Sequence, residues 1–253
     1  MYKRVVVVVL FLVFSHSAFA QCDKPIRVGV GAHWPPYFVV TDNELSGVDL
    51  DITALILENI GHCAQFVRLP SPNRMRTEFE AGRIDMLMAT SYTKERANLG
   101  NFSIAYREEI LRLMVNEQVK VNPDLPLRQL MKQHKTMVLT QNTYFGKAVA
   151  EVMDDSKFAR QIVYVSKVPL RFAMVASGHV DMTVIDELVA SHLIKLSQHN
   201  GLRFSRAPIA REPVYFLINK KIASAEFLAK FNNAIESKHA DIENKLASVR
   251  FSN

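Results

Sequence analysis

Residues 81–96 read AGRIDMLMATSYTKER, and residues 178–186 read GHVDMTVID. In both stretches a glycine is followed three residues later by an aspartate and then by a short apolar run. A helical segment precedes each stretch, beginning at Pro72 in the first copy and at Pro169 in the second. Proline suits the first turn of a helix, and glycine suits the residue after its end. Each copy therefore predicts a helix, a glycine stop and a buried strand, and the repeat predicts two similar α/β halves.

The segments around the repeat predict further strands and helices in alternation. Apolar runs predict strands at 26–30, 64–69, 86–90, 136–140, 161–165 and 182–186, with helices at 49–60 and about 144–153. Such alternation favours parallel sheets. Two longer stretches, 109–116 and 213–220, are expected to be strands that leave the first half and return to it. The helical stretch from Ala223 to Val249 is expected to pack on the first half.

The first twenty residues differ in composition from the rest of the chain. Lys3 and Arg4 precede an apolar run from Val5 to Phe14, and the small-x-small sequence Ala18-Phe19-Ala20 follows. This order of charge, apolar run and small residues is typical of a cleaved signal peptide. We therefore interpret residues 1–20 as a signal peptide and expect the protein in the periplasm.

Export favours a disulfide between Cys22 and Cys63, because the compartment outside the cytoplasm is oxidising. Each cysteine stands just before a predicted strand, and adjacent parallel strands begin on the same side of a sheet. The bridge would close a loop of about forty residues and add roughly 3–4 kcal/mol of stability in the chain-entropy model. Lipid attachment at Cys22 is the alternative, which the bulky Gln21 before it disfavours.

The composition argues against several function classes. The formal net charge of the 253-residue chain is +6, and it falls to +4 once Lys3 and Arg4 are removed. The basic residues are spread out, unlike the basic stripe of a nucleic-acid-binding protein. The eight histidines and two cysteines show no metal-binding spacing, and no hydrolase or phosphate-loop motif is present. We expect no metal, no cofactor, no catalytic residue and no nucleic-acid partner.

The polar ends of the two repeat strands predict where a ligand binds. In open α/β sheets, ligands lie beyond the carboxyl ends of the strands. The first repeat strand runs into Thr90, Ser91 and Arg96, whereas the second ends at Asp186. If the two halves face each other, a guanidinium and a carboxylate meet across a cleft. An α-amino acid carries the complementary carboxylate and ammonium groups.

The chain resembles the periplasmic solute-binding proteins of amino-acid ABC transporters, that is, the bacterial extracellular solute-binding proteins of family 3. The resemblance covers nearly all of the mature chain and rests on RVGVGAHWPPYF (27–38), GVDLDI (47–52), the block at 82–106 and GHVDMTVID (178–186). It implies an α/β fold of the type-II periplasmic binding class, with two Rossmann-like lobes of mainly parallel sheets joined by two hinge crossings. The implied division is 21–113 and 211–253 for lobe 1 and 114–210 for lobe 2.

The resemblance also implies a set of ligand-binding residues. Arg96 would hold the ligand carboxylate, Asp186 would accept its ammonium, and Tyr37 would line the side-chain pocket. Further contacts are expected from Ala89, Thr90, Ser91 and Thr143, with Trp34, Arg74 and Tyr92 as additional candidates. Asp85 and Asp181 precede the repeat strands, and we expect them to brace their lobes.

The resemblance implies that the protein binds a small polar solute, with an amino acid as the first expectation, and delivers it to a membrane ABC permease. It also implies that the protein is a monomer and not an enzyme. One alternative is a periplasmic enzyme on the same fold that resembles cyclohexadienyl dehydratase, with Asp186 and Glu187 as the second-lobe acids to test. Another is a sensory ligand-binding partner of a membrane receptor. The side chain of the ligand is not predicted.

Overall fold

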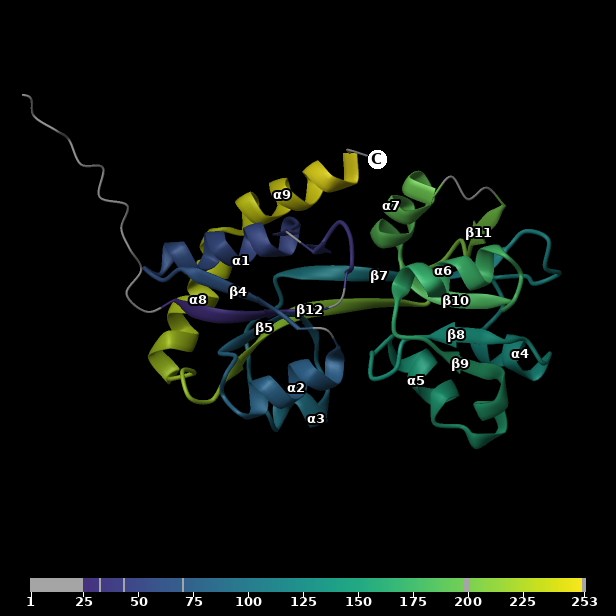
Figure 1. Ribbon diagram of the computed structural model, residues 1–253, viewed down its shortest axis with the longest axis horizontal. Coiled ribbons are helices and arrows are strands. Elements are labelled where there is room, and N and C mark those ends of the chain that lie inside the picture. Colours follow the sequence, from purple (N-terminus) through teal and green to yellow (C-terminus); the bar gives the residue numbers. More distant parts are fainter. Residues whose placement is uncertain (1–24, 32, 43, 70, 198–200, 252–253) are drawn as a thin grey trace, which may run out of the picture.

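The computed structural model describes residues 25–251 except for positions 32, 43, 70 and 198–200. The signal peptide at 1–20 and Cys22 lie outside the described residues, so the predicted cleavage and the predicted disulfide stay predictions. Figure 1 shows the elements gathered into two lobes, with the chain passing between them along two long strands.

The two long strands, β7 (Arg107–Asn116) and β12 (Ala210–Asn219), form the centre of one continuous sheet. They pair antiparallel with each other over Arg107–Leu111 and Ala210–Val214. Beyond this shared segment β12 continues into the first lobe and β7 into the second. The two crossings expected at 109–116 and 213–220 are therefore confirmed, although each strand begins two or three residues earlier.

The first lobe surrounds the strand order β4-β1-β5-β12. Its parallel strands are β1 (Ile26–Val30), β4 (Ala64–Arg68) and β5 (Met86–Ser91), and short strands occur at β2 (Val39–Val40), β3 (Leu45–Ser46) and β6 (Gly100–Phe102). Its helices are α1 (Val48–Asn59), α2 (Pro72–Glu80), α3 (Lys94–Ala97), α8 (Ala225–Ser237) and α9 (His239–Phe251). In Figure 1, α1, α8 and α9 cover one face of this sheet and α2 and α3 cover the other.

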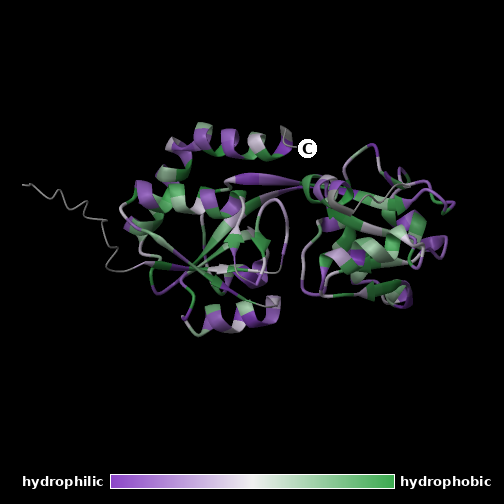
Figure 2. Ribbon diagram, turned by 45° about the horizontal axis from the view of Figure 1, so that its top comes forward, coloured by the Kyte–Doolittle hydropathy of each residue, from purple (hydrophilic) through white to green (hydrophobic). Residues whose placement is uncertain are grey.

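The second lobe surrounds the order β7-β10-β8-β9. Its parallel strands are β8 (Met137–Leu139), β9 (Ile162–Tyr164) and β10 (Met182–Asp186), and β11 (Leu202–Phe204) pairs with β7. Its helices are α4 (Leu127–Lys132), α5 (Lys147–Met153), the 3₁₀ helix η1 (Ser156–Gln161), α6 (Val168–Ala176) and α7 (Glu187–Ser197). Figure 2 shows mostly hydrophobic strands inside both lobes.

The repeat seen in the sequence is confirmed in three dimensions. Helices α2 and α6 each precede a glycine with positive φ, at 69° for Gly82 and 73° for Gly178. Asp85 then accepts a hydrogen bond from the backbone N–H of Arg27 at 3.0 Å, and Asp181 accepts one from Thr136 at 2.8 Å. Each aspartate therefore ties its own repeat strand to the start of a neighbouring strand, as its bracing role predicts.

Two predicted elements need correction. The second-lobe helix expected from about residue 144 begins only at Lys147, because Gly146 at φ 88° holds a non-helical backbone before it. The single helical stretch expected from Ala223 to Val249 is two helices, α8 and α9, which meet at Lys238. Phe231, Ile235, Ile242 and Leu246 are buried in the same core cluster as α1, so this stretch does pack on the first lobe.

Gly47 fixes the loop before α1 against the loop that carries Tyr37. Its φ is 125°, and a Cβ at this position would lie 2.4 Å from the carbonyl oxygen of Tyr37. The same approach allows the N–H of Asp49 to donate to that oxygen at 2.9 Å. Side chains at Gly47 are therefore excluded both by conformation and by space.

We predict that Gly47→Ala lowers the free energy of unfolding by about 2–4 kcal/mol, since both strain and overpacking act. Gly61→Ala is the matched control, because Gly61 also has a positive φ but a Cβ there would meet nothing within 4 Å. That control should lose only about 1 kcal/mol. Urea unfolding of the two variants measures the difference, and equal losses would contradict the close approach at Gly47.

Candidate ligand-binding site

A cavity of about 740 Å³ lies between the two lobes, and residues from both lobes line it. The first lobe contributes the end of β5 and the start of α3, with Ala89, Thr90, Ser91 and Arg96. The second lobe contributes Thr140, Thr143, Phe145 and Arg171, and the shared strand β7 contributes Glu109. The cavity thus lies at the carboxyl end of the first repeat strand, β5, and of the neighbouring strands β1 and β8, whereas no residue of the second repeat strand, β10, lines it.

The backbone at the end of β5 is held in a sparsely populated conformation. Ala89 has a φ of 51° although it is not a glycine. The pairing of β5 with β12 is also irregular between Tyr215 and Leu217. The hydroxyl of Thr90 turns back to donate to the carbonyl of Met88 at 3.1 Å. Strained backbone of this kind concentrates at functional sites, where the surrounding structure holds it in place.

Arg96 is positioned by the short helix that follows β5. Thr93 caps this helix by accepting a hydrogen bond from the N–H of Arg96 at 3.1 Å. The guanidinium Nη1 donates to the carbonyl of Ser91 at 2.9 Å. Burial lowers the pKa of Arg96, and no carboxylate of the described residues forms an ion pair with it. Arg96 therefore lines the cavity with a charged guanidinium, whose Nε and Nη2 groups can donate hydrogen bonds to a ligand.

A buried ionic network lies beside the cavity. Arg107 donates from Nε and Nη2 to the two carboxylate oxygens of Asp49, both at 2.8 Å, and both side chains are 0% exposed. The guanidinium carbon also lies 3.8 Å from the centre of the Tyr37 ring. Burial opposes the charge on Arg107, but Asp49 together with Tyr106, Tyr37 and Glu109 outweighs burial and raises the pKa of Arg107. This pair is a fixed part of the structure.

Glu109 of β7 lines the cavity, although it is not among the ligand-binding residues predicted from the sequence. Its Oε1 lies 3.3 Å from Nη1 of Arg107. Burial raises the pKa of Glu109, although the charge of Arg107 and a hydrogen bond from Trp34 act in the opposite direction. Alternation along the strand places Glu109 on the same face as Arg107, and this periodicity is the signal that could have found it.

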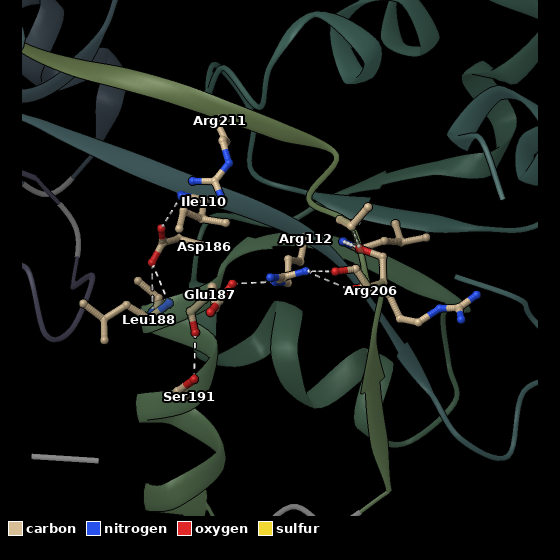
Figure 3. Close-up of polar contacts among 12 residues, drawn as sticks. Ile110, Arg112, Asp186, Glu187, Leu188, Ser191, Arg206 and Arg211 are labelled. Carbon is tan, nitrogen blue, oxygen red and sulfur yellow. Dashed lines mark hydrogen bonds and ion pairs between the residues drawn. The ribbon is translucent and has the colours of Figure 1, made fainter. Parts of the chain in front are cut away.

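Asp186 does not line the cavity, and Figure 3 shows its contacts with Ile110 and Leu188. It does end β10 as predicted, but its Oδ1 accepts hydrogen bonds from the N–H groups of Leu188 at 2.9 Å and Val189 at 3.1 Å. Its Oδ2 accepts from the N–H of Ile110 at 3.2 Å and the hydroxyl of Tyr37 at 3.4 Å. The carboxylate thus caps α7 and attaches it to β7, and its predicted role as the acceptor of the ligand ammonium stays a prediction.

The other predicted ligand residues divide in the same way. Tyr37 is buried between Arg107 and Asp186 and does not line the cavity, whereas Trp34 does. Arg74 pairs with Glu78 at 2.6 Å on an exposed face, and Tyr92 packs against Phe102 with its side chain half exposed. Glu187, named as a possible acid, pairs with Arg112 of β7 (Figure 3) and does not line the cavity.

The lobes touch across the mouth of the cavity. Asn142 of the second lobe donates from Nδ2 to Oδ1 of Asn73 on α2, at 2.8 Å. Asn142 has a φ of 58°, and the adjacent Thr143 lies four residues before α5, so Thr143 is not at the helix start that the sequence predicted. Both loop residues line the cavity, and Asn142 contacts the opposite lobe.

Within the described ranges, no group of three or more histidine, cysteine, aspartate or glutamate side chains is arranged to hold a metal ion. In the same part of the chain, no helix has the length and apolar character needed to cross a membrane.

The buried carboxylate of Asp186 predicts a pH dependence of stability. Burial, followed by the charge of Glu109, raises the pKa of Asp186 from 3.8 to about 7. The folded protein therefore binds more protons than the unfolded chain between about pH 4 and pH 7. The contribution of Asp186 is fully present below pH 4 and is lost as the pH rises through 7, by about 4 kcal/mol at most.

Urea unfolding of the parent and of Asp186→Asn between pH 4.5 and 7.5 measures this contribution. The stability of the parent should fall with rising pH relative to that of the variant, because the variant has no carboxyl group to ionise. Because the charge of Glu109 raises the pKa of Asp186, the difference between the two profiles reports the ionisation of Asp186 together with its interaction with Glu109. Parallel pH profiles would show that Asp186 is ionised throughout.

Comparison with known proteins supports the two-lobed fold. The chain is 26% identical over 236 residues to the L-arginine-binding protein of Pseudomonas aeruginosa, covering 90% of this chain and 88% of that protein. A histidine kinase sensor domain with similarity to periplasmic binding proteins superposes with a TM-score of 0.74 at 20% identity, covering 89% of this chain and 95% of that one.

A third similar structure is an ancestral amino-acid-binding protein described as a precursor of cyclohexadienyl dehydratase. Its TM-score is 0.71 at 21% identity, and the match covers 88% of this chain and 94% of that one. The family model of the bacterial extracellular solute-binding proteins, family 3, matches residues 26–248, and the chain belongs to this family.

Proposed function

We propose that the protein binds a small carboxylate-bearing solute, with an α-amino acid as the first candidate, in the cavity between its lobes. The single observation that carries the proposal is Arg96, a partly buried guanidinium on the cavity wall with no carboxylate partner among the described residues. A planar guanidinium suits a carboxylate because its donors match the two carboxylate oxygens. The chain similarity to an L-arginine-binding protein supports an amino-acid ligand.

For an amino-acid ligand, we assign the ammonium to Glu109 in place of Asp186. Glu109 lines the cavity, whereas Asp186 does not and accepts hydrogen bonds from α7, from Ile110 of β7 and from Tyr37. Arg107 and Trp34 donate hydrogen bonds to Glu109, and a carboxylate, which has about four acceptor positions, can accept a further donor from a ligand. The hydroxyls of Thr90, Ser91 and Thr143 supply further polar groups, in keeping with their predicted roles.

The proposed mechanism of binding is closure of the lobes about β7 and β12. The two strands form the crossings, and residues of both lobes line the cavity, so that rotation about the crossings would remove a bound solute from water. The lobe limits at 113/114 and 210/211 belong to this proposal. We further propose a periplasmic monomer that delivers the solute to an ABC permease. The similarity to a sensor domain supports the alternative of a receptor partner.

The experiment that tests the proposal removes the guanidinium of Arg96. Arg96→Met should weaken binding of the amino-acid ligand by roughly 30- to 3,000-fold, because losing one member of a desolvated charge pair typically costs about 2–5 kcal/mol. Isothermal titration calorimetry measures this change after a thermal-shift screen of amino acids. Arg74→Met is the matched control, since Arg74 is 59% exposed and outside the cavity.

The control should bind as tightly as the parent, and equal losses in both variants would contradict a specific role for Arg96. Glu109→Gln tests the ammonium assignment on the same ligand. Glu109→Gln should weaken binding of the amino acid more than binding of the corresponding deaminated acid. Asp186→Asn should change the two affinities by the same factor.

The enzyme alternative has its own test. Glu109, an acid of raised pKa on the cavity wall, is the group that a dehydratase mechanism would use to protonate a leaving hydroxyl. Incubating the protein with prephenate should give no aromatic product if it is a binding protein. If the parent forms the product and Glu109→Gln does not, the protein is a dehydratase and not a binding protein.

A further inference from the structure

Arg171 is a second guanidinium on the cavity wall, and it comes from the lobe opposite to Arg96. Arg171 lies in the first half of α6 and lines the cavity, and only 1% of its surface is exposed to solvent. Its guanidinium carbon lies 5.1 Å from the ring centre of Phe145 in its own lobe and 5.7 Å from that of Trp34 in the first lobe. Arg171 is thus held between two aromatic rings, at the place where the lobes meet.

The polar groups of Arg171 are largely unsatisfied. Its Nη1 is 3.4 Å from the hydroxyl oxygen of Thr140, which is a long hydrogen bond. Nε and Nη2 are buried, and no acceptor of the described residues lies within hydrogen-bond distance of either. No carboxylate of these residues forms an ion pair with it, unlike Arg107, which has Asp49. Burial lowers the pKa of Arg171 to about 10, so it stays charged at neutral pH.

A buried cation without an anion is costly, and aromatic rings offset only part of that cost. Charges taken out of water are normally paired with an opposite charge. Since no described residue supplies that charge for Arg171, we expect it to come from a bound ligand. The partner here must enter the cavity that Arg171 lines. An anionic group on the bound solute meets this requirement.

The other charged groups on the cavity wall leave Arg171 available. Arg76 is tied to Glu80 at 2.8 Å and to Glu95. Asp154 is exposed, and Glu109 is beside Arg107. The remaining cations are therefore Arg96 on one lobe and Arg171 on the other.

We propose that Arg171 binds a second anionic group of the solute, so that the site selects small solutes with two carboxylates, such as acidic amino acids or dicarboxylates. This proposal rests on the proposed function, in which Arg96 holds the first carboxylate. One carboxylate then contacts each lobe, and the solute joins the lobes electrostatically on closure. An arginine side chain, by contrast, would bring a third guanidinium into a site that already has two, which excludes it by repulsion.

The test compares two-carboxylate solutes with their monoamides. Calorimetry measures the affinities of the parent for L-glutamate, L-aspartate and glutarate, and for L-glutamine, L-asparagine and L-arginine. L-Glutamate or L-aspartate should bind at least about tenfold more tightly than its own monoamide, because the amide leaves Arg171 unpaired. The glutarate arm separates dicarboxylates from acidic amino acids, since glutarate has no ammonium for Glu109.

Arg171→Met should remove this preference, so that glutamate and glutamine bind about equally. Arg171→Lys should retain part of it, because the charge remains but the planar fork is lost. Lys167→Met is the matched control. Lys167 carries the same charge, is exposed just before α6 and does not line the cavity, so its removal should leave the preference unchanged.

Thermal melting of the ligand-free variants separates a binding role from a structural one. Arg171→Met should raise the melting temperature by a few degrees, because an apolar side chain replaces an unpaired buried charge between two aromatic rings. A lower melting temperature, together with equal losses for all ligands, would overturn the proposal in favour of a structural role. Equal binding of glutamate and glutamine by the parent would also overturn it.

Different results would contradict the two-carboxylate site and the proposed function. Tight binding of L-arginine or L-glutamine that depends on Arg96 and not on Arg171 would overturn the two-carboxylate site and leave the proposed function intact. Absence of binding by every solute of the panel would overturn the proposed function, and the inference with it.

Discussion

The buried ion pair between Asp49 and Arg107 connects the first lobe to the hinge. Asp49 lies in the first turn of α1, and Arg107 is the first residue of β7. Because both side chains are fully buried, neither charge can be lost without leaving the other uncompensated, which typically costs about 3–5 kcal/mol. The pair fixes where β7 begins, and through β7 it positions Glu109 on the cavity wall. Tyr37, packed against the same guanidinium, joins this fixed network to Asp186.

Apart from Glu109, which pairs with Arg107 and also lines the cavity, the buried charged groups at and beside the cavity fall into two kinds according to their partners. Arg107, Asp49 and Asp186 are satisfied by protein groups and lie off the cavity, where they hold elements together. Arg96 and Arg171 have hydrogen bonds only to uncharged oxygens of the described residues and lie on the cavity. Since the desolvation cost of an ion is offset only by pairing, the first kind contributes to the fold and the second kind is available for a ligand.

The features that local sequence determines were predictable, and those that depend on packing were not. Proline, glycine and aspartate at fixed offsets define the repeat, so both repeat strands were found from the sequence. Arg96 was also found, because it follows a strand end by a short turn. Asp186 was found at its strand end, but the sequence does not tell whether a carboxylate there faces a ligand or caps the next helix. Arg171 looks like an ordinary helix residue until the opposite lobe is in place.

The two arginines also bear on the proposed closure of the lobes. If the lobes close about β7 and β12 as proposed, Arg96 and Arg171 from opposite lobes would repel each other in an empty cavity, and the contact between Asn73 and Asn142 would oppose this repulsion. An anion placed between the two arginines would change this repulsion into attraction and so would favour the closed state. A solute with one carboxylate neutralises one wall, whereas a solute with two neutralises both. Arg96 and Arg171 would thus determine both which solute binds and whether the lobes close. A ligand shifts the equilibrium between open and closed lobes only by the difference between its affinities for the two states.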